Sequence, residues 1–232
     1  GIVYGNDLYP DTLGFQNLKL KWVQVYTYDE YTKLLTTRQS TFKALSVPTS
    51  GLISKYWFDG NANDTVGSNN WAVNGATSTT DRFGTNNSAY SFNGSTSYIW
   101  LSNTSTLTNN FTFSFWMNWA SNTNYQWLFV KSDWVWAATS SWAISTFPWT
   151  GNIFFNVYVW STEYRVYWPV LDNNTWYHVV ATYDGSNARI YVNGWISSSI
   201  AASGNINNIN MATTFGRYGS YNWLFFNGKI DN

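Results

Sequence analysis

The chain has no cysteine, one histidine and two glutamates, and only 10% of its residues are charged. Without cysteine it has no disulfide bond, no thiol chemistry and no cysteine-based metal site. Its 12 basic side chains balance 12 acidic ones, so no net field attracts nucleic acid or an acidic membrane surface. No apolar run reaches the roughly 18 residues that a helix needs to span a bilayer. We therefore expect no nucleic-acid partner and no membrane-spanning segment.

The start of the chain and its lack of cysteine bear on the compartment. The sequence opens at Gly1 without methionine. This is the form expected of a mature product from which an export signal has been removed. The absence of cysteine fits a secreted bacterial or archaeal protein. We expect an extracellular or cell-surface location.

Aromatic residues are what the chain has in excess. They make up 21% of its 232 residues, with 16 Trp, 17 Tyr and 15 Phe, while Asn, Ser, Thr and Gly supply most of the polar surface. This length is ample for a packed core. An uncharged, hydrogen-bonding and aromatic composition is common in extracellular β proteins.

Short runs of β-forming residues recur between clusters of Gly, Asn and Ser, and helical periodicity is nearly absent. Regular short strands separated by turn signals predict an all-β sandwich. The predicted strands are Leu18–Tyr28, Ser54–Phe58, Ser88–Phe92, Tyr98–Leu101, Phe111–Trp119, Trp127–Val130, Ile153–Trp160, Glu163–Trp168, Trp176–Tyr183, Arg189–Val192 and Trp223–Phe226.

Residues 176–194, WYHVVATYDGSNARIYVNG, carry the most specific local pattern. Two β-forming runs flank Asp184-Gly185, and Asn193-Gly194 closes the second run. Asp-Gly and Asn-Gly tolerate the positive φ angles of tight turns. The stretch therefore predicts strand, turn, strand, turn.

This hairpin resembles the signature hairpin of LamG-like jelly rolls, the laminin-G and concanavalin-A-like family. Further blocks are similar to that family in the same order, so the resemblance covers residues 51–232. These blocks are GLISKYWFDGNANDTVGSNNWAVNGA from Gly51, TTDRFGTNNSAYSFNGSTSYIWL from Thr79, FTFSFWMNW from Phe111 and FNGKID from Phe226. The resemblance implies an antiparallel jelly-roll sandwich of two sheets. It implies no single function, because this fold hosts lectins, adhesins, glycanases and structural modules.

Residues 1–50 lie outside the resemblance and have the pattern of a strand-like arm. Pro48 and Ser50-Gly51 mark a joint between this arm and the jelly-roll domain of residues 51–232. In the family, the equivalent of FNGKID leads into one more long strand, which this sequence lacks. A sandwich short of one strand exposes an unpaired edge, and the arm is a candidate to fill it. Whether it pairs within its own chain or with a neighbouring copy stays open. The candidate assembly residues are Leu18, Leu20, Trp22, Val23 and Val25.

The acidic residues argue against catalysis. Glycanases of the family that this chain resembles typically have an ExDxxE run on one strand, and this sequence has no such run. Its two glutamates, Glu30 and Glu163, lie far apart in the sequence. Hydrolysis by paired carboxylates needs two such groups flanking one bond. Within residues 51–232, Asp59 and Asp64 form the acidic pair that is closest in sequence. A lone histidine, here His178, is more often a hydrogen-bonded structural residue. We therefore predict no catalytic residues and no enzymatic activity.

Calcium is the only cofactor that the sequence suggests, and weakly. Asp59, Asn61 and Asp64 in FDGNAND supply hard oxygen ligands near a turn. The interpretation that we favour is that they cap their own backbone as Asx turns.

Two larger sets of residues are candidates for sugar chemistry. Exposed Trp side chains stack on sugar faces, but Trp residues also fill cores and dominate interfaces between copies. The candidates for stacking are Trp100, Trp119, Trp134, Trp136, Trp160 and Trp168. Asparagines that begin an N-x-S/T sequon are candidates for glycosylation: Asn63, Asn86, Asn93, Asn103, Asn110 and Asn173.

Three functions fit these observations. The first, which we favour from the sequence, is a non-catalytic extracellular structural protein, a filament or appendage subunit in which strand addition joins copies of the chain. The second is a lectin-like module that binds cell-surface glycans in adhesion. The third is a subunit of a viral tail or spike.

Overall fold

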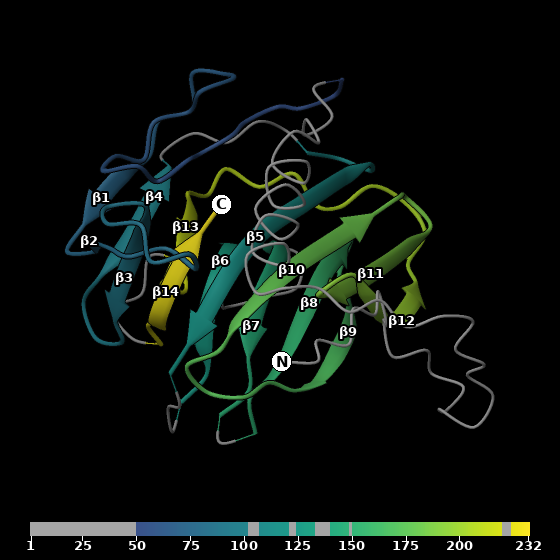
Figure 1. The fold of residues 1–232 in the computed structure, drawn as a ribbon. Helices are drawn as coiled ribbons and strands as arrows, with labels where there is room; N and C mark the ends of the chain where they lie inside the picture. Colours follow the sequence, from purple (N-terminus) through teal and green to yellow (C-terminus); the bar gives the residue numbers. More distant parts are fainter. Residues whose placement is uncertain (1–49, 102–106, 121–123, 133–139, 149, 220–223) are drawn as a thin grey trace, which may run out of the picture. The chain divides into compact units, whose positions relative to one another are not determined.

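The structure is a computed structural model, and it describes residues 50–101, 107–120, 124–132, 140–148, 150–219 and 224–232 (Figure 1). The chain divides into two units, Gly1–Leu52 and Ile53–Asn232, and the second unit contains all of the described strands. The predicted assembly residues Leu18, Leu20, Trp22, Val23 and Val25 lie outside the described residues.

The second unit is built from strands, and no described helix is long and apolar enough to span a membrane. The strands are β1 (Ala72–Asn74), β2 (Thr77–Thr79), β3 (Ala89–Asn93), β4 (Tyr98–Leu101), β5 (Phe111–Trp119), β6 (Gln126–Ser132), β7 (Ser140–Thr146), β8 (Asn152–Val159), β9 (Thr162–Val170), β10 (Trp176–Tyr183), β11 (Asn187–Val192), β12 (Trp195–Ala201), β13 (Thr213–Phe215) and β14 (Asn227–Asp231).

These strands form two antiparallel sheets of seven strands each. We call the sheet with the order β1-β4-β13-β6-β7-β8-β9 sheet A, and the sheet with the order β12-β11-β10-β5-β14-β3-β2 sheet B. In Figure 1, β8, β9, β11 and β12 lie at one side of the sandwich, and β1 to β4 lie at the other. The predicted jelly-roll-like sandwich of two sheets is confirmed.

The β10–β11–β12 meander follows the predicted pattern. Gly185 has φ 80°, and the Asp184 carboxylate accepts the backbone N–H of Asn187 at 2.7 Å, so the Asp-Gly pair makes the first turn. Asn193 and Gly194 both have positive φ, 51° and 83°, and they make the second. Both predicted turns are confirmed.

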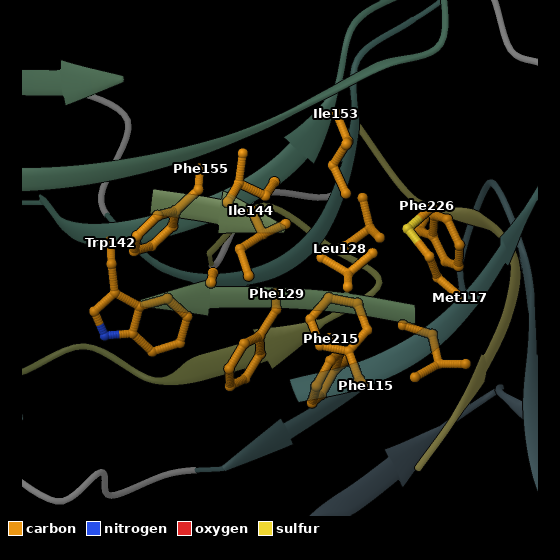
Figure 2. Packing of buried hydrophobic residues seen from close by; sticks show 14 of the residues in the cluster. Phe115, Met117, Leu128, Phe129, Trp142, Ile144, Ile153, Phe155, Phe215 and Phe226 are labelled. Atoms are coloured by element: carbon orange, nitrogen blue, oxygen red, sulfur yellow. The ribbon is translucent and has the colours of Figure 1, made fainter. Parts of the chain in front are cut away.

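Aromatic rings fill the space between the sheets (Figure 2). Phe129 of β6 stacks on Phe215 of β13 at 4.1 Å between ring centroids, and it contacts Trp142 of β7 at 4.5 Å. From sheet B, Phe113 lies 4.9 Å from Phe129 and Phe115 lies 5.9 Å from Phe215. Offset and edge-on ring contacts of this kind stabilise beyond the area they bury. This cluster therefore ties the two sheets together.

Sheet A is buried on both faces at its centre. Every residue of β6 and β7 is buried, although side chains alternate between the two faces of a strand. The face away from the interior has a second apolar cluster around Trp127, Phe154 and Tyr218. Such doubly buried strands lack the apolar–polar alternation that predicts a strand, and β7, SSWAIST, was not predicted for this reason.

Two predicted strands are wrong. Ser54–Phe58 has no strand, because side chains hold this segment instead of a ladder: the Asp64 carboxylate accepts the Lys55 N–H at 3.0 Å. Within Trp223–Phe226, the described residues 224–226 form no strand either, because Leu224 has φ 66° and breaks the extended backbone. The last strand instead begins one residue later, at Asn227. Four further strands were not predicted: β12 and the three-residue strands β1, β2 and β13.

Replacement of Phe129 by Ala should lower the free energy of unfolding by about 3–5 kcal/mol, because it opens a cavity among the rings that join the sheets. Urea denaturation followed by circular dichroism measures the change. The matched control is Phe83→Ala, since Phe83 is 78% exposed and its loss should change stability by no more than about 0.5 kcal/mol. Equal stability losses in the two variants would contradict the role of the ring cluster.

Candidate functional site on the β8–β9 hairpin

The hairpin of β8 and β9 places polar and aromatic side chains on the outer face of sheet A. On β8, Phe155, Val157 and Val159 belong to the core between the sheets. Because side chains alternate, their neighbours point to the outer face. These outer residues lie opposite residues of β9 in three cross-strand pairs: Tyr158–Glu163, Asn156–Arg165 and Phe154–Tyr167.

Trp160 stands at the tip of this hairpin and is 80% exposed. Val159 pairs with Thr162, so Trp160 and Ser161 alone make the turn. Trp160 has φ 57°, and in a two-residue turn with positive φ at the first position glycine is the favoured residue. A bulky side chain held in this region costs about 1–3 kcal/mol. The sequence thus keeps a large exposed indole where glycine would fold more easily.

Asn207 fixes the backbone of this tip. Its side-chain amide donates to the Trp160 carbonyl at 2.7 Å and to the Ser140 carbonyl at 2.9 Å. Its own N–H donates to the Tyr158 carbonyl at 2.9 Å. One asparagine therefore joins the first residue of β7, the last part of β8 and the turn. One of these hydrogen bonds holds the Trp160 backbone, and the other two tie Asn207 to β7 and β8.

A polar centre follows the tip along the outer face. Arg165 is paired with Glu163, and its Nε donates to Asn156 Oδ1 at 2.8 Å. The side chains of Arg165 and Glu163 are 27% and 35% exposed, whereas Asn156 is fully buried beneath them. Burial, and then the negative charge of Glu163, raise the pKa of Tyr158, so its hydroxyl keeps its proton. The centre therefore offers hydrogen-bond donors and acceptors with no net charge.

Aromatic rings flank the polar centre on the side away from the tip. Tyr167, 45% exposed, stacks on Phe147 at 5.8 Å with an interplanar angle of 23°. The guanidinium carbon of Arg165 lies 4.6 Å from the centre of the Phe154 ring, which fixes the plane of the cation. Tyr125 continues this group of rings at 5.3 Å from Phe147. The hairpin thus has an exposed indole at its tip, and its outer face has a polar centre followed by an exposed aromatic group.

The structure places the predicted stacking tryptophans in different environments. Trp119 is 2% exposed and packs in the core, so the expectation that it stacks on a sugar is corrected. Gly151 abuts it, and a Cβ there would lie 2.4 Å from the Trp119 ring. Trp168 points from β9 toward the core, on the face of the strand that does not carry Tyr167. Trp100 is half-buried on β4. Trp134 and Trp136 lie outside the described residues.

Sequence reasoning named Trp160 as a candidate for stacking but did not name the residues that accompany it. Arg165, Tyr167, Asn156 and Tyr158 were not predicted to belong to a site, and Glu163 was considered only as a catalyst. The signal was present in the alternation of residues 163–167, EYRVY, and 154–158, FFNVY, which sets each of these residues on one face of its strand.

The outer face of sheet B has a second polar group, around His178. Its ring stacks on Trp116 at 5.1 Å and its Nε2 lies 2.9 Å from Ser114 Oγ. Burial, and then the positive charge of Arg82, lower the pKa of His178. Arg82 is itself paired with Asp231. His178 is thus hydrogen-bonded and packed, as expected of a structural histidine.

The predicted calcium ligands lie in the 53–69 loop, and Asp64 organises this loop. Its Oδ1 accepts the N–H groups of Lys55, Val66 and Gly67 at 3.0 Å each, and its Oδ2 accepts that of Asn69 at 3.2 Å. Burial acts to raise the pKa of Asp64, but the hydrogen bonds from Gly67, Val66 and Lys55 outweigh it and lower the pKa to about 2.

Asn61 makes a separate Asx turn in the same loop, because its Oδ1 accepts the Asn63 N–H at 2.9 Å. No group of three or more His, Cys, Asp or Glu side chains suited to a metal occurs in the described residues. Calcium binding by Asp59, Asn61 and Asp64 stays a prediction, and the Asx-turn interpretation accounts for Asn61 and Asp64.

The sequon asparagines differ in how their amides are used. Asn63, Asn86, Asn110 and Asn173 are exposed, and Asn103 lies outside the described residues. The Asn93 amide nitrogen donates to Thr96 Oγ1 at 2.8 Å, and its oxygen accepts the N–H groups of Ser95 and Thr96. Glycosylation of these residues stays a prediction.

Comparisons with known proteins agree with the fold. The sequence model of the concanavalin A-like lectin/glucanases superfamily matches residues 92–232, and the chain belongs to this superfamily. Comparison with curated proteins gives no match.

Among solved structures, one similar domain is domain 4 of AbnA, an extracellular GH43 arabinanase from Geobacillus stearothermophilus, in complex with arabinotriose. It has a TM-score of 0.61 and 22% identity, over 78% of this chain and 89% of that chain. The binding domain of botulinum neurotoxin serotype D has a TM-score of 0.56 and 13% identity, over 78% of this chain and 48% of that chain. These likenesses show the fold.

Asp64 should make folding sensitive to acid. Its pKa of about 2 in the folded chain lies below the roughly 3.9 of an unfolded aspartate, so its contribution is complete above the unfolded pKa and is lost as the pH falls through the folded one. With solvent screening, we expect a loss of about 1–2 kcal/mol between pH 5 and pH 2. Asp64→Asn should lack this loss in urea titrations, and Asp59→Asn on the same loop should keep it. A wild-type pH slope in Asp64→Asn would contradict this account.

Proposed function

We propose that residues 53–232 form a non-catalytic, extracellular glycan-binding module, and that the outer face of the β8–β9 hairpin binds neutral saccharides. The observation that carries the proposal is Trp160, an indole 80% exposed and held at the hairpin tip in a conformation that favours glycine. Strained residues persist where the surrounding structure over-determines them, and they cluster at binding sites. Solvation alone gives no reason to keep a tryptophan there.

The chemistry of the neighbouring side chains supports a saccharide as the ligand. Sugar rings present an apolar C–H face and a rim of hydroxyl groups, so they need an aromatic surface beside paired donors and acceptors. Trp160 and Tyr167 supply the aromatic surface. The Arg165–Glu163 pair supplies the hydrogen-bond donors and acceptors. Because the charges of Arg165 and Glu163 cancel, the site favours a neutral ligand over an acidic one. Membership of a superfamily of lectins and glucanases, and the likeness to a domain solved with arabinotriose, support the same class of ligand.

The acidic residues of the hairpin support binding without catalysis. Glu163 is the only carboxylate on the described β8–β9 hairpin, and Arg165 neutralises it. Hydrolysis of a glycosidic bond needs a second carboxyl group across the bond. An extracellular location follows the expectation from the sequence and suits a module that meets polysaccharides.

Trp160→Ala should weaken saccharide binding by about 10- to 100-fold, because it removes a large exposed aromatic contact. Isothermal titration calorimetry against a saccharide selected on a glycan array measures the change. Trp57→Ala is the matched control, since Trp57 is 46% exposed and lies on the 53–69 loop, outside the hairpin. If Trp160→Ala binds as tightly as Trp57→Ala, the hairpin is not the site. An array without hits on folded protein would overturn the function itself.

A second candidate function is self-assembly by strand addition, and the edges of the two sheets favour it. Among the described strands, β1 and β9 of sheet A and β12 and β2 of sheet B each have a strand partner on one side. An unpaired run of backbone N–H and C=O groups is a template for a strand from another chain. The strand-like pattern of residues 18–28 is the candidate donor, and the product would be a filament or appendage of many copies.

Deletion of residues 1–30 should then produce a monomer with a lower melting temperature, and a peptide of residues 18–28 should restore the lost stability. Size-exclusion chromatography with light scattering, run beside thermal denaturation, measures both. The control peptide has the same composition in scrambled order. An unchanged mass and melting temperature after the deletion would refute the assembly.

A further inference from the structure

Resting on the proposed saccharide-binding function, we infer that the β8–β9 face binds an extended internal segment of a neutral polysaccharide, laid along the strands from Trp160 to Tyr167. A single terminal sugar would use one end of this face only. The inference depends on the spacing of the two exposed aromatic side chains, on the exposure of the residues between them and on the order of the tip backbone and the Tyr167 ring before binding.

The spacing of the aromatic side chains exceeds one sugar ring. From Thr162 at the start of β9 to Tyr167 there are five residue steps. At a rise of about 3.3 Å per residue, this is about 16 Å of strand, and Trp160 lies beyond it in the turn. A ligand that contacts both aromatic side chains must therefore contain several linked rings.

The residues between the aromatic side chains form a continuous polar shelf. On β9, Glu163 and Arg165 lie on the same face as Tyr167, between it and the turn that carries Trp160, and they remain partly exposed. The facing β8 residues are buried beneath them, and Asn156 holds the Arg165 guanidinium at 2.8 Å. The hydroxyl groups of the sugar rings in the middle of the bound segment would contact the Arg165–Glu163 ion pair. An oriented pair of this kind binds a hydroxyl as donor and as acceptor together.

The backbone of the tip and the ring of Tyr167 are held in place before any ligand arrives. Asn207 holds the Trp160 carbonyl at 2.7 Å, and Tyr167 stacks on Phe147 and contacts Phe154 at 6.3 Å. Because these groups are already ordered, a sugar contact with them costs less entropy than a contact with a free loop and a free ring. Affinity should therefore grow with ligand length until the chain reaches both aromatic side chains, and then level off.

The test uses the full chain and begins with affinity electrophoresis through gels that contain arabinan, xylan, glucomannan, mixed-linkage β-glucan, polygalacturonate or alginate. We expect retardation by one or more of the neutral polymers and none by the two acidic ones. Retardation by the acidic polymers alone would overturn the neutral polysaccharide and leave saccharide binding intact. Retardation by none of the six would overturn the proposed function and the inference together.

Calorimetry then measures oligosaccharides of the retarding polymer, from the disaccharide to the hexasaccharide. The inference expects the dissociation constant to fall by about tenfold or more over this range. It also expects Trp160→Ala and Tyr167→Ala each to remove most of that gain, with Trp57→Ala as the control. Equal affinity for the disaccharide and the hexasaccharide, with Trp160→Ala still weakening both, would overturn the extended mode while the saccharide-binding function stands.

Discussion

The contact between Phe129 and Phe215, 4.1 Å apart, is the constraint on which the rest of the structure depends. The two rings come from β6 and β13 of sheet A, and Phe113 and Phe115 of sheet B pack against them. Together the four rings fill the space between the two sheets. Trp142 extends the same cluster to β7, which pairs with β8. The hairpin that carries the candidate site is therefore joined to the ring cluster through two successive strand pairings, β7 with β8 and β8 with β9.

The fold could be predicted from the sequence because its turns have strong local signals. Asp184-Gly185 and Asn193-Gly194 made the positive φ angles of two turns explicit, and the Phe111–Trp119 alternation predicted a strand whose observed bounds are the same. Segments without these signals were predicted incorrectly. Ser54–Phe58 has the residues of a strand, but the Asp64 carboxylate accepts the backbone N–H of Lys55. Whether a distant side chain takes a hydrogen bond from the ladder is a tertiary effect, and no local pattern contains it.

The candidate site was harder to predict than the fold. Trp160 drew attention through its residue type, but so did Trp119, which fills the core. The two differ in environment: Trp119 faces the other sheet from a central strand, whereas Trp160 stands in a turn of two residues. The hydrogen bond between Arg165 and Asn156 could not be predicted, because it joins adjacent strands whose register cannot be derived from the sequence. A polar side chain on a strand has meaning only once its cross-strand neighbour is known.

The left-handed backbone of Trp160 has a consequence for how this domain responds to selection. Glycine at that position relieves the backbone strain, so a selection for heat resistance alone rewards the loss of the indole. Any lineage or laboratory population that keeps tryptophan there is under a second pressure that opposes thermal stability. The residue therefore serves as an indicator: its retention or loss among variants chosen for stability tells whether the outer face of the hairpin was in use.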